Sequence, residues 1–462
     1  MPATAPPDSA APAAPKRQLT LFDSTCIIVG IIIGAGIYRT APDVAKAAGS
    51  WWGVMLIWLA GGLLSLCGAS NYAELATAYP RAGGDYVYLT RAYGRWAGFL
   101  FGWIQLVVVR PADIAAMAFI FALYAREIYH LLPDYDASYS LRVYAIGAVT
   151  LLTAINIVGV REGKWTQNVL AVVKAVGLIA IVVVAFVAPR GQAPAETVGE
   201  FPLAVAMIFV LFTFGGWNEM AYVAAEVKNP ERNITRALLF GTAAVTVLYL
   251  VANGAFLYTL GYAGLANSKA VAADAISTVF VDYGGQIISV LICISALGVV
   301  NGQIFTGARI SFAVGADHRA FRILGTWNPK TGTPIRSLLA QGAIAIALIA
   351  TLGSFVEAII YAVAAVYLFY LGTSLAVIVL RWKEPEVHRP YRVTGYPVTT
   401  LVFSAVCAFL IYRAFVFKPL ISAVALGVVF LGLPIYWLSR GPQDEPAEDA
   451  SSPEQEHPDQ NE

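Results

Sequence analysis

The chain contains a succession of apolar segments, each near the length of a bilayer-spanning helix. About 20 apolar residues cross the hydrocarbon core as a helix, and an open sheet could not satisfy its backbone groups there. The segments therefore predict an all-α integral membrane protein with about 12 transmembrane helices. They cover residues 22–46, 51–79, 96–125, 141–160, 166–188, 202–226, 235–261, 284–314, 334–352, 354–380, 396–416 and 419–439.

The composition agrees, since 58% of the 462 residues are hydrophobic and 13% are charged. A soluble domain could not bury that much apolar surface. Residues 1–18, rich in Ala and Pro, and the acidic residues 441–462 lack the apolar content needed to fold, so we expect disordered tails around a membrane domain at 19–440. Residues 262–283 are too polar to span and predict an external loop with short helices. No cleaved signal peptide is expected.

The basic residues between the segments predict the orientation. With 12 spans both tails lie on one side, and that side carries 19 Lys and Arg residues against seven on the other. Cytoplasmic loops are enriched in basic residues. We therefore expect a multi-pass protein of the plasma (inner) membrane with both tails in the cytoplasm.

Two segments carry closely spaced glycines near their middle. "GIIIGAGIY" contains Gly34 and Gly36, and "FTFGGWNEM" contains Gly215 and Gly216. Glycine weakens a helix by about 0.5–1 kcal/mol relative to alanine. Interruptions at matching places in two halves of a membrane chain point to a transporter's binding site. The pattern predicts two five-helix repeats of opposite topology, about 22–188 and 202–380, followed by extra helices at about 396–439.

Unwound backbone at these glycines would need a polar partner, because lipid cannot satisfy it. The amides of Ala35, Gly36 and Ile37 would begin a half-helix and suit a carboxylate. Carbonyls around Ile31 and Ile32 would end the preceding half-helix and suit an ammonium group. The break at 214–216 would supply further carbonyls, so the two breaks predict a site for an α-amino acid. The alternative is that the glycines only allow close helix packing.

Ionisable residues inside the apolar segments are further candidates, because charge is costly at membrane depth. Arg110 and Asp113 are three residues apart on one helix and predict a structural ion pair, with a direct role in substrate binding as the alternative. The sequence allows two roles for Glu219. If it faces the cavity it favours a cationic substrate, and if it faces away it is a paired structural residue.

Five stretches together resemble one family. They are "GIIIGAGIY", "YAELATAYPRAGGDYVYLTRAYG" at 72–94, "WIQLVVVRPADIAAMAFIFALY" at 103–124, "FTFGGWNEMAYVAAEVKNPERNI" at 212–234 and "SALGVVNGQIFTGARISFAVG" at 295–315. The chain resembles the amino acid–polyamine–organocation superfamily, and within it the L-type amino acid transporters. The resemblance implies the leucine-transporter fold, with the first and sixth helices broken, and alternating access.

The resemblance also implies roles for particular residues. Carboxylate contacts fall at Ala35 and Gly36, and ammonium contacts at the backbone of Ile32, Phe212 and Gly215. Phe212 would be an aromatic lid over the substrate, and Asn218 a polar contact. The full set of predicted substrate-binding residues is Ile31, Ile32, Gly34, Ala35, Gly36, Ile37, Phe212, Phe214, Gly215 and Asn218. The predicted gating or coupling residues are Lys174, Phe212, Trp217, Glu219, Arg110 and Asp113.

Lys174 falls where the family has a fifth-helix lysine. Its ammonium could replace the sodium ion that some relatives bind, which predicts sodium-independent transport, or it could carry a proton. Where this sequence has Ala35 the family often has Ser, so one side-chain contact is lost. Animal members pair with a glycoprotein through a cysteine in the loop after the third helix. "HLLPDYDASYSLR" has none, so no disulfide-linked heavy chain is expected.

These observations predict a secondary transporter of neutral α-amino acids that works by exchange against a counter-substrate amino acid or by proton coupling. A transporter of cationic amino acids or polyamines and a non-transporting amino-acid sensor remain as alternatives. No nucleophile–base pair or ligand cluster suggests an enzyme, and no cofactor, metal or nucleic-acid partner is expected. The lipid bilayer is the expected surrounding.

Overall fold

The computed structural model describes residues 16–34, 36–131, 135–187, 201–268, 271–277, 284–351, 355–417 and 419–438. Ala35 and most of both predicted tails lie outside these residues. Within the described part of the chain, all regular elements are helices. They are α1 (Leu21–Ile32), α2 (Gly36–Ala48), α3 (Trp51–Ala78), α4 (Asp85–Tyr93), α5 (Arg95–Ile104), η1 (Gln105–Val109), α6 (Arg110–Ile128), α7 (Ala137–Val158), α8 (Val160–Val187), α9 (Leu203–Thr213), α10 (Glu219–Tyr222), η2 (Ala224–Glu226), α11 (Pro230–Asn267), α12 (Val271–Ser277), α13 (Gly284–Asp317), η3 (Arg319–Phe321), α14 (Ile335–Thr351), α15 (Phe355–Lys383), α16 (Val398–Phe417) and α17 (Pro419–Leu438).

Every predicted apolar segment lies on one or more of these helices, so the all-α prediction is confirmed. Among the described residues, eight helices are long and apolar enough to cross a membrane, or nine when the bent pair α1–α2 counts as one span. The remaining apolar helices α9 and α14 and residues 422–438 are shorter than a full span. The number of 12 crossings therefore stays a prediction.

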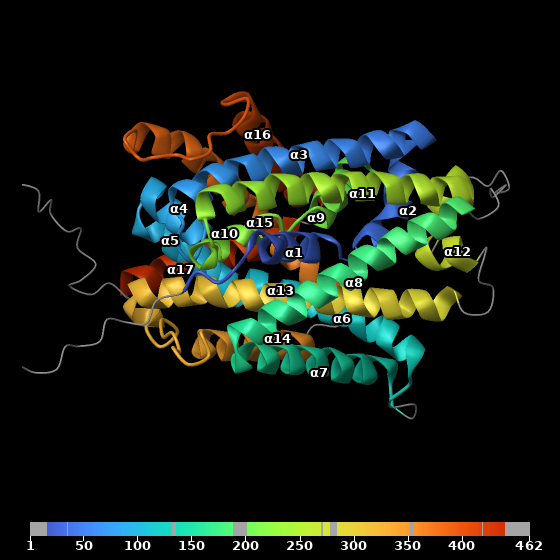
Figure 1. Ribbon diagram of the computed structural model, residues 1–462, viewed down its shortest axis with the longest axis horizontal. Helices are drawn as coiled ribbons and strands as arrows, with labels where there is room; N and C mark the ends of the chain where they lie inside the picture. The colour runs from blue at the N-terminus through green and yellow to red at the C-terminus, as the bar shows by residue number, and fades with distance from the viewer. Residues whose placement is uncertain are drawn as a thin grey trace, which may run out of the picture.

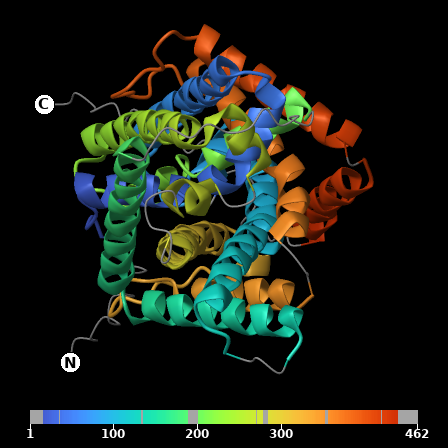
Figure 2. The ribbon, with the colours of Figure 1, turned by 90° about the vertical axis from the view of Figure 1, so that its right-hand side faces the viewer.

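The long helices run roughly parallel, and two of them form the interior (Figure 1). The span from Arg95 to Ile128 has 78% of its apolar window buried, and α13 has 72%, whereas α16 has 28%. Helix α13 packs against α6, α8 and α14, and the end-on view shows it surrounded by other helices (Figure 2). Outer helices keep apolar side chains such as Val183 and Phe240 exposed, as contact with lipid requires.

The third predicted segment contains a local irregularity that positions its polar residues. Five residues from Gln105 to Val109 form a π-helix, and Arg110 follows with Pro111 in the next position. Proline has no N–H to donate, so it weakens the helical ladder behind it, and a wider turn accommodates this defect. The turn places Arg110 on a buried face, where its Nε donates to the Gln105 side chain over 3.0 Å.

Candidate functional site

The first predicted break is present. Helix α1 ends at Ile32, and α2 begins at Gly36 with a bend of 48° between the two axes. Ile33 has φ −69° and ψ 84°, and the Gly34 N–H donates to the Ile32 carbonyl over 2.7 Å, which is the hydrogen bond of an inverse γ-turn. The chain therefore leaves the α-helical ladder just before the two glycines, as the sequence predicts.

The second predicted break is also present. Helix α9 ends at Thr213, and α10 starts at Glu219. The Gly215 N–H donates to the Phe212 carbonyl over 2.9 Å, and Gly216 has φ +109°, a backbone conformation that glycine adopts far more easily than other residues. The glycine pair thus allows a sharp turn that an ordinary residue would strain.

The two breaks lie directly against each other. A Cβ added to Gly216 would come within 2.5 Å of Ile31 in α1, and a Cβ on Gly36 would come within 2.9 Å of the Thr213 hydroxyl. The Tyr249 hydroxyl of α11 donates to the Ile32 carbonyl over 2.7 Å and lies 3.4 Å from the Thr213 carbonyl. One tyrosine hydroxyl therefore contacts carbonyls from both broken helices.

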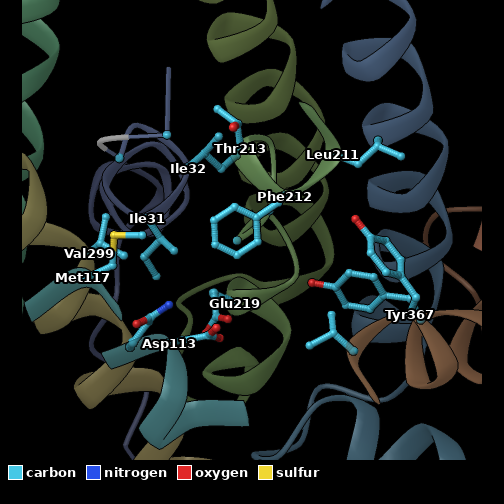
Figure 3. Close-up of a pocket in the computed structure, with 17 residues that line it drawn as sticks. Ile31, Ile32, Asp113, Met117, Leu211, Phe212, Thr213, Glu219, Val299 and Tyr367 are labelled. Atoms are coloured by element: carbon cyan, nitrogen blue, oxygen red, sulfur yellow. The ribbon is translucent and has the colours of Figure 1, made fainter. Parts of the chain in front are cut away.

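A cavity of about 100 Å³ lies beside the paired breaks. Figure 3 shows the Phe212 ring in its middle, with Asp113 and Met117 on one side and Tyr367 on the other. The lining residues are Ile31, Ile32, Gly34, Gly36, Asp113, Met117, Leu211, Phe212, Thr213, Gly215, Gly216, Glu219, Val299, Gln303, Val366, Tyr367 and Tyr370. The wall combines backbone from two helix breaks with aromatic, apolar and acidic side chains.

Many of the predicted substrate residues line this cavity, but some do not. Those on the wall are Ile31, Ile32, Gly34, Gly36, Phe212 and Gly215. Ala35 lies outside the described residues. Ile37 has no exposed surface and lies in the apolar core. Phe214 packs on Trp58 and Tyr249, with ring centroids 6.0 and 5.1 Å away.

Asn218 and Trp217 form a layer behind the cavity wall. The Asn218 amide donates to the Tyr222 hydroxyl over 2.8 Å and accepts from the Tyr370 hydroxyl over 2.9 Å. The Trp217 ring is buried against Tyr72, Tyr370 and Phe403. Both residues contact Tyr370, which is itself on the wall. Their predicted roles in binding and gating stay predictions.

The predicted ion pair between Arg110 and Asp113 is wrong about the partner. The Arg110 guanidinium makes a two-pronged contact with Glu219, with N–O distances of 2.8 Å for both prongs. Thr306 of α13 donates to the same carboxylate. Glu219 comes from a different helix, so both of its carboxylate oxygens can face the two guanidinium nitrogens of Arg110. A carboxylate three residues away on the same helix is less well placed for this bidentate contact. Glu219 therefore lines the cavity and is also paired.

Lys174 does not line the cavity, but its ammonium reaches the first break from behind. Its Nζ donates to the Gly30 carbonyl of α1 and lies 3.4 Å from the Ser295 carbonyl of α13. A Cβ on Gly298 would come within 2.9 Å of the same nitrogen, so that glycine leaves the space that the ammonium occupies. Lys174 thus joins α8 to two other helices at the depth of the break.

Several residues at the site were missed from the sequence. The most important are Tyr249, which contacts both breaks, and Ser295, whose hydroxyl donates to the Ile33 carbonyl over 3.1 Å. Gln303 lies on the cavity wall. Each is a polar side chain inside an apolar segment, and that pattern was the available clue. Asp85 also went unnoticed, although it accepts hydrogen bonds from Tyr72, Tyr222 and Thr373.

Apolar helices around a cavity built on two helix breaks define a membrane transport protein. The chain belongs to the amino acid permease family, whose model matches residues 19–438. It is 31% identical over 438 residues to Asc-type amino acid transporter 1 of Mus musculus, covering 92% of this chain and 81% of that protein. It is 31% identical to large neutral amino acids transporter small subunit 2 of Homo sapiens, covering 92% and 80%. It is 29% identical to the serine/threonine exchanger SteT of Bacillus subtilis, covering 91% and 96%.

Proposed function

We propose that this protein is a secondary active transporter of small neutral α-amino acids. The observation that carries the proposal is the cavity of about 100 Å³ formed where the two breaks meet, with Phe212 in its middle. That ring leaves little room for a long substrate side chain. Two of the relatives above, one named for large neutral amino acids and one for serine and threonine, support the neutral class.

In the proposed site, the backbone recognises the two charged groups that every α-amino acid shares. Gly36 begins α2 and lies on the cavity wall, so the N-terminal end of that helix faces the cavity and suits the substrate carboxylate. Helices α1 and α9 end at the same cavity, and the partial negative charge of their C-terminal ends suits the ammonium. Phe212 would then cover the bound substrate.

Lys174 supports a mechanism without sodium. Its ammonium is a fixed positive charge held against the carbonyls of Gly30 and Ser295. A sodium ion at the same carbonyls would face direct electrostatic repulsion. We infer that transport runs by amino-acid exchange or by proton coupling, through alternating access.

The finer features of the architecture belong to this proposal. We propose 12 crossings in the leucine-transporter arrangement, with repeats at about 22–188 and 202–380 and both tails in the cytoplasm. The plasma membrane is the proposed location. The loop between α6 and α7 contains no cysteine, which supports a transporter that works without a disulfide-linked heavy chain.

A counterflow screen in proteoliposomes tests the function directly. Purified protein is reconstituted with an unlabelled amino acid inside, and uptake of labelled alanine, serine, leucine, arginine and putrescine is measured with and without sodium and a pH gradient. We expect small neutral amino acids to exchange equally well with and without sodium. Preferred uptake of arginine or putrescine would contradict the neutral class, and binding without flux would indicate a sensor.

A further inference from the structure

Asp113 is a carboxylate on the cavity wall that the proposed mechanism has not used. It lies in the first turn of α6, one turn before Met117, and both side chains line the cavity. Figure 3 shows it on the opposite side of the Phe212 ring from Tyr367. The residue is half-buried because its exposed surface faces this internal space.

Asp113 differs from its acidic neighbour in having no bonding partner. Glu219 is held by two nitrogens of Arg110 and by the Thr306 hydroxyl. Asp113 accepts no hydrogen bond and forms no ion pair within the part of the chain that the structure describes. A carboxylate removed from bulk water strongly favours a hydrogen-bond donor or a positive charge beside it.

Several other polar groups near the cavity are already engaged, whereas the Gln303 side-chain amide and the Tyr367 hydroxyl on the wall make no hydrogen bond among the described residues. Arg110 is committed to Glu219 and Gln105. The Tyr370 hydroxyl donates to Asn218, and the Lys174 ammonium is directed at backbone carbonyls outside the cavity wall. Arg110 is close enough to Asp113 to attract it but bonds Glu219, so two wall carboxylates share one guanidinium and the wall keeps a net negative charge facing whatever occupies the cavity.

The position of Asp113 identifies the part of a substrate that would meet it. The breaks that suit the α-carboxylate and α-ammonium contribute Gly36 and Gly215 to the cavity wall. Asp113 comes from α6, which forms neither break, and shares the wall with Val299 and Gln303 of α13, of which Val299 lies against Gly34. A substrate held by its backbone groups at the breaks would direct its side chain toward this wall.

We propose that Asp113 is a specificity-determining residue that accepts a hydrogen bond from the side chain of the transported amino acid. The favoured substrates are neutral amino acids whose side chain carries a hydroxyl donor. This inference rests on the proposed function for the orientation of the substrate. It adds a selectivity that neither the helix breaks nor the cavity volume would supply, because these features treat isosteric side chains alike.

Two isosteric pairs of ligands test the proposal. Threonine and valine have the same shape and differ by one hydroxyl, and 2,4-diaminobutyrate and norvaline differ by one ammonium group. Hydrogen bonds to a charged group favour the donor by roughly tenfold to a hundredfold. We expect threonine to bind roughly tenfold more tightly than valine, measured by ligand-induced thermal shift and by inhibition of counterflow. Preferred binding of 2,4-diaminobutyrate over threonine would contradict the neutral class of the proposed function.

Substitutions separate the two donor types. Asp113→Ala removes the acceptor, so both preferences should fall to about one while binding of valine is retained. Asp113→Asn keeps an acceptor oxygen but removes the charge, so a preference for the amine should disappear and a preference for the hydroxyl should persist. Leu123→Ala, at an exposed position of the same helix, is the control and should keep the wild-type ratios.

The ratios within each variant do not depend on its expression level. Equal binding of the isosteres by the wild type, or ratios that survive Asp113→Ala, would overturn the inference. The thermal shift reports binding without requiring flux. A protein that binds donor ligands through Asp113 but moves none of them would therefore support this inference while contradicting the proposed transport.

Discussion

Glu219 and Asp113 show how two carboxylates on one wall acquire different roles. Glu219 meets a bidentate guanidinium from another helix, so its charge is balanced inside the protein. Asp113 lies only three residues after that same arginine, yet it has no such contact among the described residues. Balanced charges are structural, whereas an unbalanced one is available to a ligand.

Substitutions of Arg110 and Glu219 should have non-additive effects on the stability of the protein. Both side chains are almost fully buried, so Arg110→Met or Glu219→Met alone leaves an uncompensated charge and should destabilise the protein by about 3–5 kcal/mol. The double variant leaves neither charge unpaired and should be more stable than either single variant. Thermal unfolding in detergent compares the wild type, the two single variants and the double variant. Single variants as stable as the wild type would contradict the expected coupling.

Lys174→Ala should abolish amino-acid uptake, because it removes the donor to the Gly30 and Ser295 carbonyls beside the first break. Val173→Ala, at the neighbouring lipid-exposed position, is the control and should transport normally. Uptake is measured in proteoliposomes with equal amounts of folded protein. Unchanged uptake in Lys174→Ala, with no new dependence on sodium, would show that the ammonium is not needed.

The broken helices form one site because their ends meet at the same cavity. Helix α1 presents its C-terminus and α2 its N-terminus at the cavity, and α9 adds a second C-terminus. Close approach between them depends on glycine, since a side chain at Gly216 would collide with Ile31. Tyr249 then links the break in α1 to the end of α9.

Gly216→Ala should impair both folding and transport. The positive φ of +109° strains any residue with a Cβ, by about 1–3 kcal/mol, and the added carbon would come within 2.5 Å of Ile31. Gly254→Ala is the matched control in α11, because a Cβ there meets nothing within 4 Å. That variant should be as stable as the wild type or more stable by about 0.4–1 kcal/mol. Normal uptake by Gly216→Ala would argue against a tight turn at the second break.

Across the whole molecule, interhelical polar contacts collect at the end that carries α4 and α10 (Figure 1). Three ion pairs there join segments distant in sequence: Glu74 with Arg381, Glu226 with Arg309, and Arg91 with Glu384. A hydrogen-bond chain also leads away from the cavity through Tyr370, Asn218, Tyr222 and Asp85. These contacts join α3, α4, α13 and α15 to segments distant in the sequence.

The outermost of these pairs should give a small pH dependence. Burial by itself would raise the pKa of Glu384, but hydrogen bonds from Arg91 and Tyr79 hold that pKa below its ordinary value of 4.5. The stabilisation is therefore complete above about pH 4.5 and is lost as the pH falls through the lower, folded-state pKa. Because both side chains are partly exposed, the effect should stay below about 1 kcal/mol.

Glu384→Gln measures that contribution against the wild type. The difference in unfolding temperature should be present at pH 7 and should shrink as the pH falls below about 4.5. A difference that grows with acid would reverse the expected sign. Glu386→Gln, two residues further along the same exposed loop, serves as a control and should show no such pH-dependent difference.

Much of the architecture could be predicted from local sequence. Long apolar segments must form helices in lipid, because each backbone group needs a partner within its own segment. The breaks at Gly34 and Gly216 were also predictable, since the conformational freedom of glycine belongs to the residue itself. The matching places of the two glycine pairs also predicted that both breaks share one binding site.

The contacts between helices could not be predicted from local sequence. Arg110 was expected to pair three residues away, but its partner is Glu219, 109 residues along the chain. Phe214, Trp217 and Asn218 adjoin the second break, yet all three turn away from the cavity. Which face of a helix meets a cavity depends on its rotation and on its register with neighbouring helices. Those two quantities are set by packing between distant segments, so the folded arrangement was needed to find Tyr249 and the unpaired Asp113.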